Sequence, residues 1–176
     1  MTNWIFDLDY TLYDMKKNSF DYKLLSQNSE LNKKIMNLPG RKILYTNGNL
    51  NHTLQCMKCM KMEKIFHKIC CREVTGFKPY LNSYVKLYHE AKIGLNDKCY
   101  FFEDTPVNLV QAKKFNWITI LISRDNPKFL KIKYPEIDYI FPDIIEAINY
   151  FNCKNNWYYR ESGSTQKRVF GLVLIQ

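Results

Sequence analysis

The chain has 176 residues, enough for one domain with a buried core, and its 46% hydrophobic and 24% charged residues argue against a chain that is disordered as a whole. Its formal net charge of +9 at pH 7 suits an anionic ligand, from a nucleotide to a nucleic acid, and equally a lysine-rich solvated surface. No run approaches the roughly 18 apolar residues of a membrane span, and no signal peptide is recognisable at the N-terminus. We therefore expect a soluble, cytoplasmic protein with no membrane partner, whose six cysteines stay reduced.

Short apolar segments alternate with longer amphipathic ones along most of the chain. The short segments are β-branched or aromatic and predict buried strands, whereas the longer ones predict helices. Repetition of strand, helix and strand predicts an α/β fold, a three-layer sandwich with a parallel sheet between helices. The expected strands are 3–7, 42–46, 69–72, 99–102 and 117–122, and the expected helices are 52–62, 81–93, 107–115 and 144–151.

The segment 14–38 differs from the rest because it is polar and rich in Asn and Lys. Its scattered apolar residues, closed by Pro39-Gly40, predict a small helical insertion after the first strand. Residues 1–152 then form one core that contains this insertion. Residues 153–176 form a C-terminal tail, either an extra edge element or a poorly ordered appendage, and the appendage is favoured.

Two carboxylates, Asp7 and Asp9, follow the first expected strand, where both can project into one ligand crevice. Asp7 is the candidate nucleophile, because its carboxylate can attack phosphorus and form an aspartyl-phosphate. Asp9 is the candidate general acid/base, which protonates the leaving oxygen and later deprotonates the water that cleaves the intermediate. The alternative is a pair of strand-end carboxylates that caps a turn.

Two later loops offer groups for binding phosphate. Thr46-Asn47-Gly48 ends the second strand before a helix, so a hydroxyl, an amide and free N–H groups can form a cradle, although Asn-Gly also marks any tight turn. Lys78 follows the third strand, just before a proline suited to the first turn of a helix. Its ammonium can neutralise phosphate oxygens and reduce their repulsion of the attacking carboxylate.

Consecutive acids, Glu103 and Asp104, end the fourth strand, and a hard divalent cation such as Mg²⁺ would compensate them. Asp104 is the expected direct ligand, joined by Asp7 and the backbone carbonyl of Asp9. Glu103 and Asn108 are expected to support these ligands, with Asn108 holding a metal-bound water or orienting Asp104. A helix N-cap at Asp104 or at the residue after it is compatible with this role.

Taken in order, these motifs resemble the haloacid dehalogenase-like superfamily of phosphohydrolases over residues 4–151. The resemblance implies a Rossmann-like core, Mg²⁺ as cofactor, an aspartyl-phosphate intermediate, and the roles given above to Asp7, Asp9, Thr46, Asn47, Lys78 and Asp104. The segments that resemble the pyrimidine 5′-nucleotidase-like branch are Phe6-Asp7-Leu8-Asp9-Tyr10-Thr11-Leu12-Tyr13, Thr46-Asn47-Gly48, Lys78-Pro79 with Tyr84, and Phe102-Glu103-Asp104 with Asn108-Leu109. This branch implies a nucleoside monophosphate as substrate.

Two features depart from the family pattern. Relatives often carry two Asp where this chain has Glu103-Asp104, and their cap is larger than the insertion at 14–38. A reduced cap leaves the cleft more open. A macromolecular substrate, either a nucleic-acid end or a phosphoprotein, is therefore the alternative to a phosphorylated small molecule.

A second alternative is a non-catalytic zinc- or ligand-binding module. Cys56, Cys59, His67, Cys70 and Cys71 offer enough ligands for zinc, although both segments are needed to build the core. The other histidines, His52 and His89, fall on expected helices and are interpreted as surface or core residues.

Overall fold

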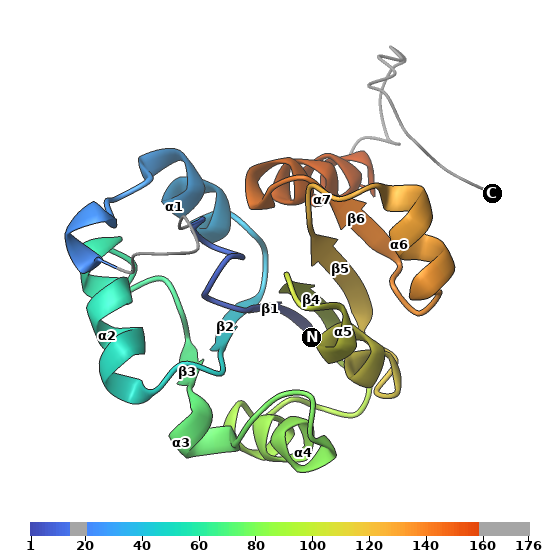
Figure 1. Ribbon diagram of the computed structural model, residues 1–176, viewed down its shortest axis with the longest axis horizontal. Helices are drawn as coiled ribbons and strands as arrows, with labels where there is room; N and C mark the ends of the chain where they lie inside the picture. The colour runs from blue at the N-terminus through green and yellow to red at the C-terminus, as the bar shows by residue number, and fades with distance from the viewer. Residues whose placement is uncertain (15–20, 159–176) are drawn as a thin grey trace.

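The computed structural model describes residues 1–14 and 21–158, with side chains described as far as Cys153, and contains a six-stranded parallel sheet (Figure 1). Its strands are β1 (Thr2–Phe6), β2 (Arg41–Tyr45), β3 (Lys68–Cys70), β4 (Lys98–Glu103), β5 (Ile118–Ile122) and β6 (Tyr139–Phe141). They lie in the order β3-β2-β1-β4-β5-β6, and every neighbouring pair is parallel. The predicted α/β class with a parallel sheet is confirmed.

The helical elements of the described chain are η1 (Tyr22–Leu24, a 3-10 turn), α1 (Ser29–Met36), α2 (Leu50–Cys59), α3 (Arg72–Thr75), α4 (Leu81–Glu90), α5 (Pro106–Lys113), α6 (Pro127–Lys133) and α7 (Ile144–Tyr158). The four helices predicted from long amphipathic segments correspond to α2, α4, α5 and α7 of the described chain. None of the described helices is long and apolar enough to cross a bilayer.

The sequence pattern did not predict three elements, β6, α3 and α6. β6 and α3 have three and four residues, too few to show a period, and α6 buries only Leu130. The helix predicted at 144–151 starts as expected but continues to Tyr158. The strand predicted at 69–72 ends at Cys70, because the next helix begins at Arg72.

Two hydrophobic clusters lie on opposite faces of the sheet. Alternate residues of a strand point to opposite faces, so Trp4 and Phe6 join one cluster and Ile5 the other. The first cluster includes buried residues of α1, α2 and α7, and the second includes those of α4, α5 and α6. The sheet therefore lies between two helical layers, as the three-layer prediction requires, and Figure 1 shows the helices surrounding the strands.

The order of the strands reverses between β1 and β4, because β2 and β3 lie on one side and β5 and β6 on the other. Ligands bind beyond the carboxyl ends of the strands at such a switch point. β1 ends at Phe6 and β4 at Glu103, so Asp7 and Asp104 each follow one of the two adjacent strand ends. The Asp7 amide donates to the Phe102 carbonyl at 2.9 Å, which holds the two ends together.

The described part of the predicted insertion contains η1 and α1. Asn28 caps α1 by accepting a hydrogen bond from the Leu31 amide at 3.0 Å, and Leu31 and Ile35 are buried in the same cluster as residues of α7. The division into core, insertion and tail, and the role of 14–38 as a cap, stay predictions. Residues 15–20 of the insertion and 159–176 of the predicted tail lie outside the described residues.

Candidate active site

A buried lysine joins two carboxylates from different strand ends. The Lys78 ammonium donates to Asp7 Oδ1 at 2.6 Å, to Glu103 Oε2 at 2.7 Å and to the Tyr45 carbonyl at 2.8 Å. The three charged side chains are at most 7% exposed. Buried charges are tolerated when they are paired and hydrogen-bonded, as here. Three residues predicted for the site therefore meet at the switch point.

The pKa values follow from one positive charge facing two negative ones. Burial, and next the Glu103 carboxylate, raises the pKa of Asp7 from 3.8 to about 7 against the opposing effect of Lys78. Burial also raises the pKa of Glu103. Burial by itself would lower the pKa of Lys78, but the two carboxylates outweigh it and raise that pKa. The Lys78 ammonium thus stays charged, but its single positive charge does not compensate the negative charges of both Asp7 and Glu103.

Asp104 brings a third carboxylate to this group, and burial raises its pKa as well. One carboxylate oxygen each of Asp7, Glu103 and Asp104 lies within 4.8 Å of the others. Mg²⁺ is bound by one or two carboxylates together with water and phosphate oxygens, so this under-compensated oxygen cluster fits it. Asp7 and Asp104 would hold the ion, and the backbone carbonyl of Asp9 stays a predicted ligand.

Glu103 is engaged through both of its oxygens. Oε2 accepts from Lys78, and Oε1 accepts from the Thr105 amide at 3.1 Å. Both oxygens therefore have hydrogen-bond partners, and the supporting role predicted for Glu103 stays a prediction.

Asp9, two residues after Asp7, is 32% exposed. Its Oδ1 accepts from the Tyr13 hydroxyl and lies 2.7 Å from Nε2 of His52, whose Nδ1 lies 3.0 Å from the Tyr22 hydroxyl. Burial, and then the bond to Asp9, raises the pKa of Tyr13 far above its usual range, so its hydroxyl remains a donor. The candidate acid/base is thus held by Tyr13 of its own loop and by His52 of α2.

His52 lies on a helix as expected, but its contact with Asp9 was not predicted. The two residues are 43 positions apart, beyond the reach of any local pattern. One signal was nevertheless present in the sequence. His52 lies in the first turn of the helix that follows Thr46-Asn47-Gly48, and the first turn after a strand end faces the ligand crevice of a parallel sheet.

The loop after β2 is fastened to Lys78. Asn47 donates from Nδ2 to the Lys78 carbonyl at 3.1 Å and accepts at Oδ1 from the Lys78 amide at 2.8 Å. The buried Thr46 hydroxyl accepts from the Gly48 amide at 2.9 Å. A Cβ on Gly48 would lie 2.8 Å from Cδ2 of His52, so a glycine lets the ring approach. Phosphate binding by Thr46, Asn47 and Lys78 stays a prediction.

The loops after β3 and β4 differ in how they enter their helices. Pro79 does not open a helix as expected, because α4 begins at Leu81 after the cap residue Tyr80. In contrast, Thr105 is the N-cap of α5 and Pro106 follows it in the first turn, as the N-cap alternative predicted.

Asn108 is buried in the first turn of α5. Its backbone carbonyl accepts from the hydroxyl of Tyr84, a buried residue of α4, at 2.7 Å. This bond ties α4 to α5. The role predicted for the Asn108 side chain near Asp104 stays a prediction.

The zinc set predicted as an alternative does not assemble. Within residues 1–14 and 21–158, two groups could share an ion: Asp7 with Glu103 and Asp104, and Asp9 with His52 and Cys56. Neither contains the other four residues of the predicted set, Cys59, His67, Cys70 and Cys71. His67 instead accepts from the Lys42 amide at Nδ1, and Cys70 is buried in β3.

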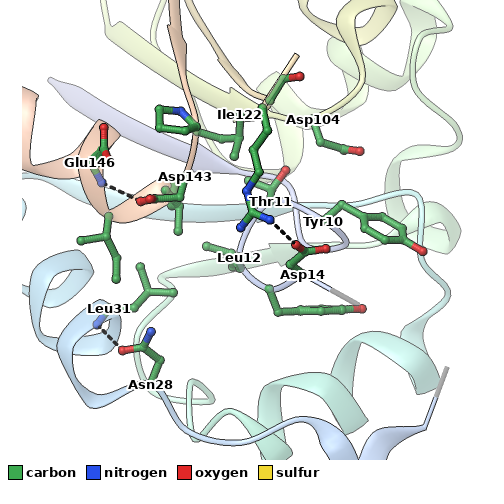
Figure 2. Close-up of a pocket in the computed structure, with 16 residues that line it drawn as sticks. Tyr10, Thr11, Leu12, Asp14, Asn28, Leu31, Asp104, Ile122, Asp143 and Glu146 are labelled. Carbon is green, nitrogen blue, oxygen red and sulfur yellow. Dashed lines mark hydrogen bonds and ion pairs between the residues drawn. The ribbon is translucent and has the colours of Figure 1, made fainter. Parts of the chain in front are cut away.

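A pocket of about 750 Å³ opens beside Asp104. Its walls come from the loop after β1, α1, the end of β5 and the start of α7. Figure 2 shows Asp104 at one side of the pocket and Asp143 and Glu146 at the other. Its size lies in the range of about 300–1,000 Å³ that is usual for small-molecule sites.

Solved structures with a similar fold include enzymes of the haloacid dehalogenase type. The L-2-haloacid dehalogenase from Xanthobacter autotrophicus matches with a TM-score of 0.61 and 13% identity, over 74% of this chain and 63% of its own. Another dehalogenase matches with a TM-score of 0.61 and 18% identity, over 74% and 58%. A candidate β-phosphoglucomutase from Thermotoga maritima matches with a TM-score of 0.60 and 14% identity, over 86% and 99%.

These likenesses show a Rossmann-like, haloacid dehalogenase-like fold, and the chain spans less than two thirds of the length of the dehalogenases. No protein-family model matches the sequence. A search of curated proteins finds no match either.

Proposed function

We propose that the chain is a Mg²⁺-dependent phosphomonoester hydrolase that forms an aspartyl-phosphate on Asp7. The observation that carries the proposal is the position of the Asp7 carboxylate. It is buried at the switch point, bonded to Lys78 and grouped with Asp104, and Asp9 follows two residues later. A nucleophile, an acid/base and positive charge for the phosphate therefore come from neighbouring loops.

The reaction is a double displacement. The Asp7 carboxylate attacks phosphorus, the bond from phosphorus to the leaving oxygen breaks, and Asp9 gives that oxygen a proton. Asp9 then takes a proton from water as the water attacks phosphorus, which releases inorganic phosphate and restores Asp7. Lys78, Thr46 and Asn47 bind phosphate oxygens. When bound by Asp7 and Asp104, Mg²⁺ supplies charge stabilisation to the transferring phosphoryl group.

A nucleoside monophosphate is the proposed substrate. The motifs that resemble the pyrimidine 5′-nucleotidase-like branch favour it. The pocket beside Asp104 has the size of a small-molecule site, but Asp7 and Asp9 do not line it, so its volume does not identify the leaving group. The net charge of +9 agrees with an anionic substrate of either size.

A phosphatase screen tests the proposal. Purified protein is assayed against nucleotides, sugar phosphates and 3′- or 5′-phosphorylated oligonucleotides, with Mg²⁺ and with chelator. We expect phosphate release from at least one nucleoside monophosphate with Mg²⁺, a fall of at least about 10²-fold in chelator, and recovery on adding Mg²⁺ back. Equal rates with Mg²⁺ and with chelator would refute the metal requirement.

Salt dependence separates the small substrate from the macromolecular one. Several lysine contacts to a nucleic-acid backbone would make KM rise steeply between about 50 and 200 mM salt, whereas one phosphate group gives a shallow dependence. We expect a nucleoside monophosphate to show less than about a fivefold change in KM over this range. Preference for a phosphorylated oligonucleotide, with a steep salt dependence, would instead support the macromolecular alternative.

A further inference from the structure

We propose that His52 is a positioning residue for Asp9, and that Tyr22 of the insertion holds His52 in turn. The inference rests on the proposed function, since it concerns the acid/base carboxylate of that reaction. It assigns a task to a histidine that the sequence analysis interpreted as a surface or core residue.

The contact between His52 and Asp9 is a direct one. Nε2 of His52 lies 2.7 Å from Asp9 Oδ1, the same oxygen that accepts from the Tyr13 hydroxyl. In the described part of the chain, both hydrogen bonds of the Asp9 side chain thus involve Oδ1. A carboxylate held through one oxygen presents the other in a fixed direction, so Oδ2 is the oxygen that exchanges a proton with the leaving group and with water.

The imidazole is itself fixed from several sides, as a positioning group must be. The backbone amide of His52 donates to Oδ1 of the cap residue Asn49 at 2.7 Å, which fixes the first turn of α2. Nδ1 lies 3.0 Å from the Tyr22 hydroxyl, and Cys56, one helical turn further, places Sγ 3.7 Å from Nε2. Gly48 leaves space for the ring. A ring bonded at both nitrogens has a defined orientation.

An ion held between these side chains accounts for the distances less well. Zinc bonds of about 2.0–2.1 Å in a tetrahedral arrangement keep two N or O ligand atoms about 3.3 Å apart. The separation of 2.7 Å between His52 Nε2 and Asp9 Oδ1 is that of a hydrogen bond. We therefore assign the cluster to orientation of Asp9 rather than to metal binding.

This role predicts an effect that depends on the leaving group. Departure of an alkoxide requires the proton from Asp9, whereas p-nitrophenolate leaves without one. The kcat/KM value covers only the steps up to departure of the leaving group. Loss of orientation should therefore lower kcat/KM for an alkyl phosphate and spare it for p-nitrophenyl phosphate.

The experiment compares His52→Ala, His52→Gln, Tyr22→Phe and the wild type on p-nitrophenyl phosphate and on the alkyl phosphate that the wild type hydrolyses fastest. For His52→Ala we expect kcat/KM to fall about 10²-fold on the alkyl phosphate and less than about threefold on p-nitrophenyl phosphate. His52→Gln, whose amide N–H can replace Nε2–H, should recover to within about tenfold of the wild type. Tyr22→Phe should show the same selectivity with a smaller fall.

His89→Ala is the matched control, because it removes an exposed imidazole from α4. It should leave kcat/KM unchanged for both substrates. Equal losses on both substrates in His52→Ala, or no loss on either, would overturn the inference while leaving the proposed function intact.

A second measurement does not depend on turnover. Proton NMR of wild-type protein should show a downfield His52 Nε2–H resonance that disappears in Asp9→Ala. If the wild type shows this resonance but has no phosphatase activity, the proposed function is rejected while the contact between His52 and Asp9 is supported. Absence of the resonance would reject the contact.

Discussion

Replacing Asp7 by asparagine is expected to abolish phosphate release and to stabilise the metal-free protein. Turnover should fall by at least about 10⁴-fold, because an amide cannot form the covalent intermediate. The fold should persist, since the Asn oxygen can still accept from Lys78 and Glu103 still pairs with that ammonium. Steady-state kinetics and circular dichroism check the two parts.

The gain in stability has a defined pH dependence. The pKa of Asp7 is about 7 in the folded chain, above its ordinary value of 3.8, so the folded state resists ionisation of Asp7 more than the unfolded state does. The resulting penalty is absent below about pH 4, grows through pH 4–7 and is complete above pH 7. Asp7→Asn should therefore raise Tm in chelator by up to about 10 °C at pH 8 and by little at pH 4.

A lower Tm for Asp7→Asn at pH 8 in chelator would contradict this electrostatic account. Mg²⁺ supplies the reverse control, because it should stabilise the wild type, which has the full set of carboxylates, more than the variant. Full activity in Asp7→Asn would reject the nucleophile.

Replacing Lys78 by methionine is expected to cause the largest loss of stability among the site residues. Removing one member of a buried ion pair leaves uncompensated charge and costs about 3–5 kcal/mol. Lys78 Nζ lies 4.9 Å and 5.3 Å from the ring centroids of Tyr45 and Phe101, so a methionine side chain can pack in its place. The loss of stability therefore reflects mainly the removed charge. Phosphatase activity should be lost as well.

Lys68→Met is the matched control, because Lys68 pairs with Glu90 at 2.8 Å where both side chains are partly exposed. Such a pair contributes about 0–1 kcal/mol. Urea unfolding of both variants measures the difference, and adding Glu103→Gln to Lys78→Met should recover part of the loss. Equal costs for the two lysines would show that the buried network does not stabilise the fold.

The positions of the motifs were predictable from the sequence. Asp7, Thr46, Lys78 and Asp104 each follow a short apolar segment, and parallel strands bring their carboxyl ends to one edge of a sheet. The predicted strands were therefore enough to indicate that these residues, far apart in the chain, lie close together in the fold. Long amphipathic helices such as α4 were found for the same reason, whereas β6 has three residues and carries no period.

Only the tertiary structure decided which side chains touch. Lys78 meets Asp7 across 71 residues and Glu103 across 25, and the strand order alone brings their three loops together. His52 reaches Asp9 because Gly48 leaves space for its ring, and Cys59 and His67, offered by their spacing as zinc ligands, take no part in a common cluster among the described residues. Local pattern determines where a chain forms a strand or a helix. The pairing of side chains within the aspartate site depends on long-range packing. The Asp7 and Asp9 motif and the position of Lys78 were therefore predictable from the sequence, but the bonds from Lys78 to Asp7 and from His52 to Asp9 were not.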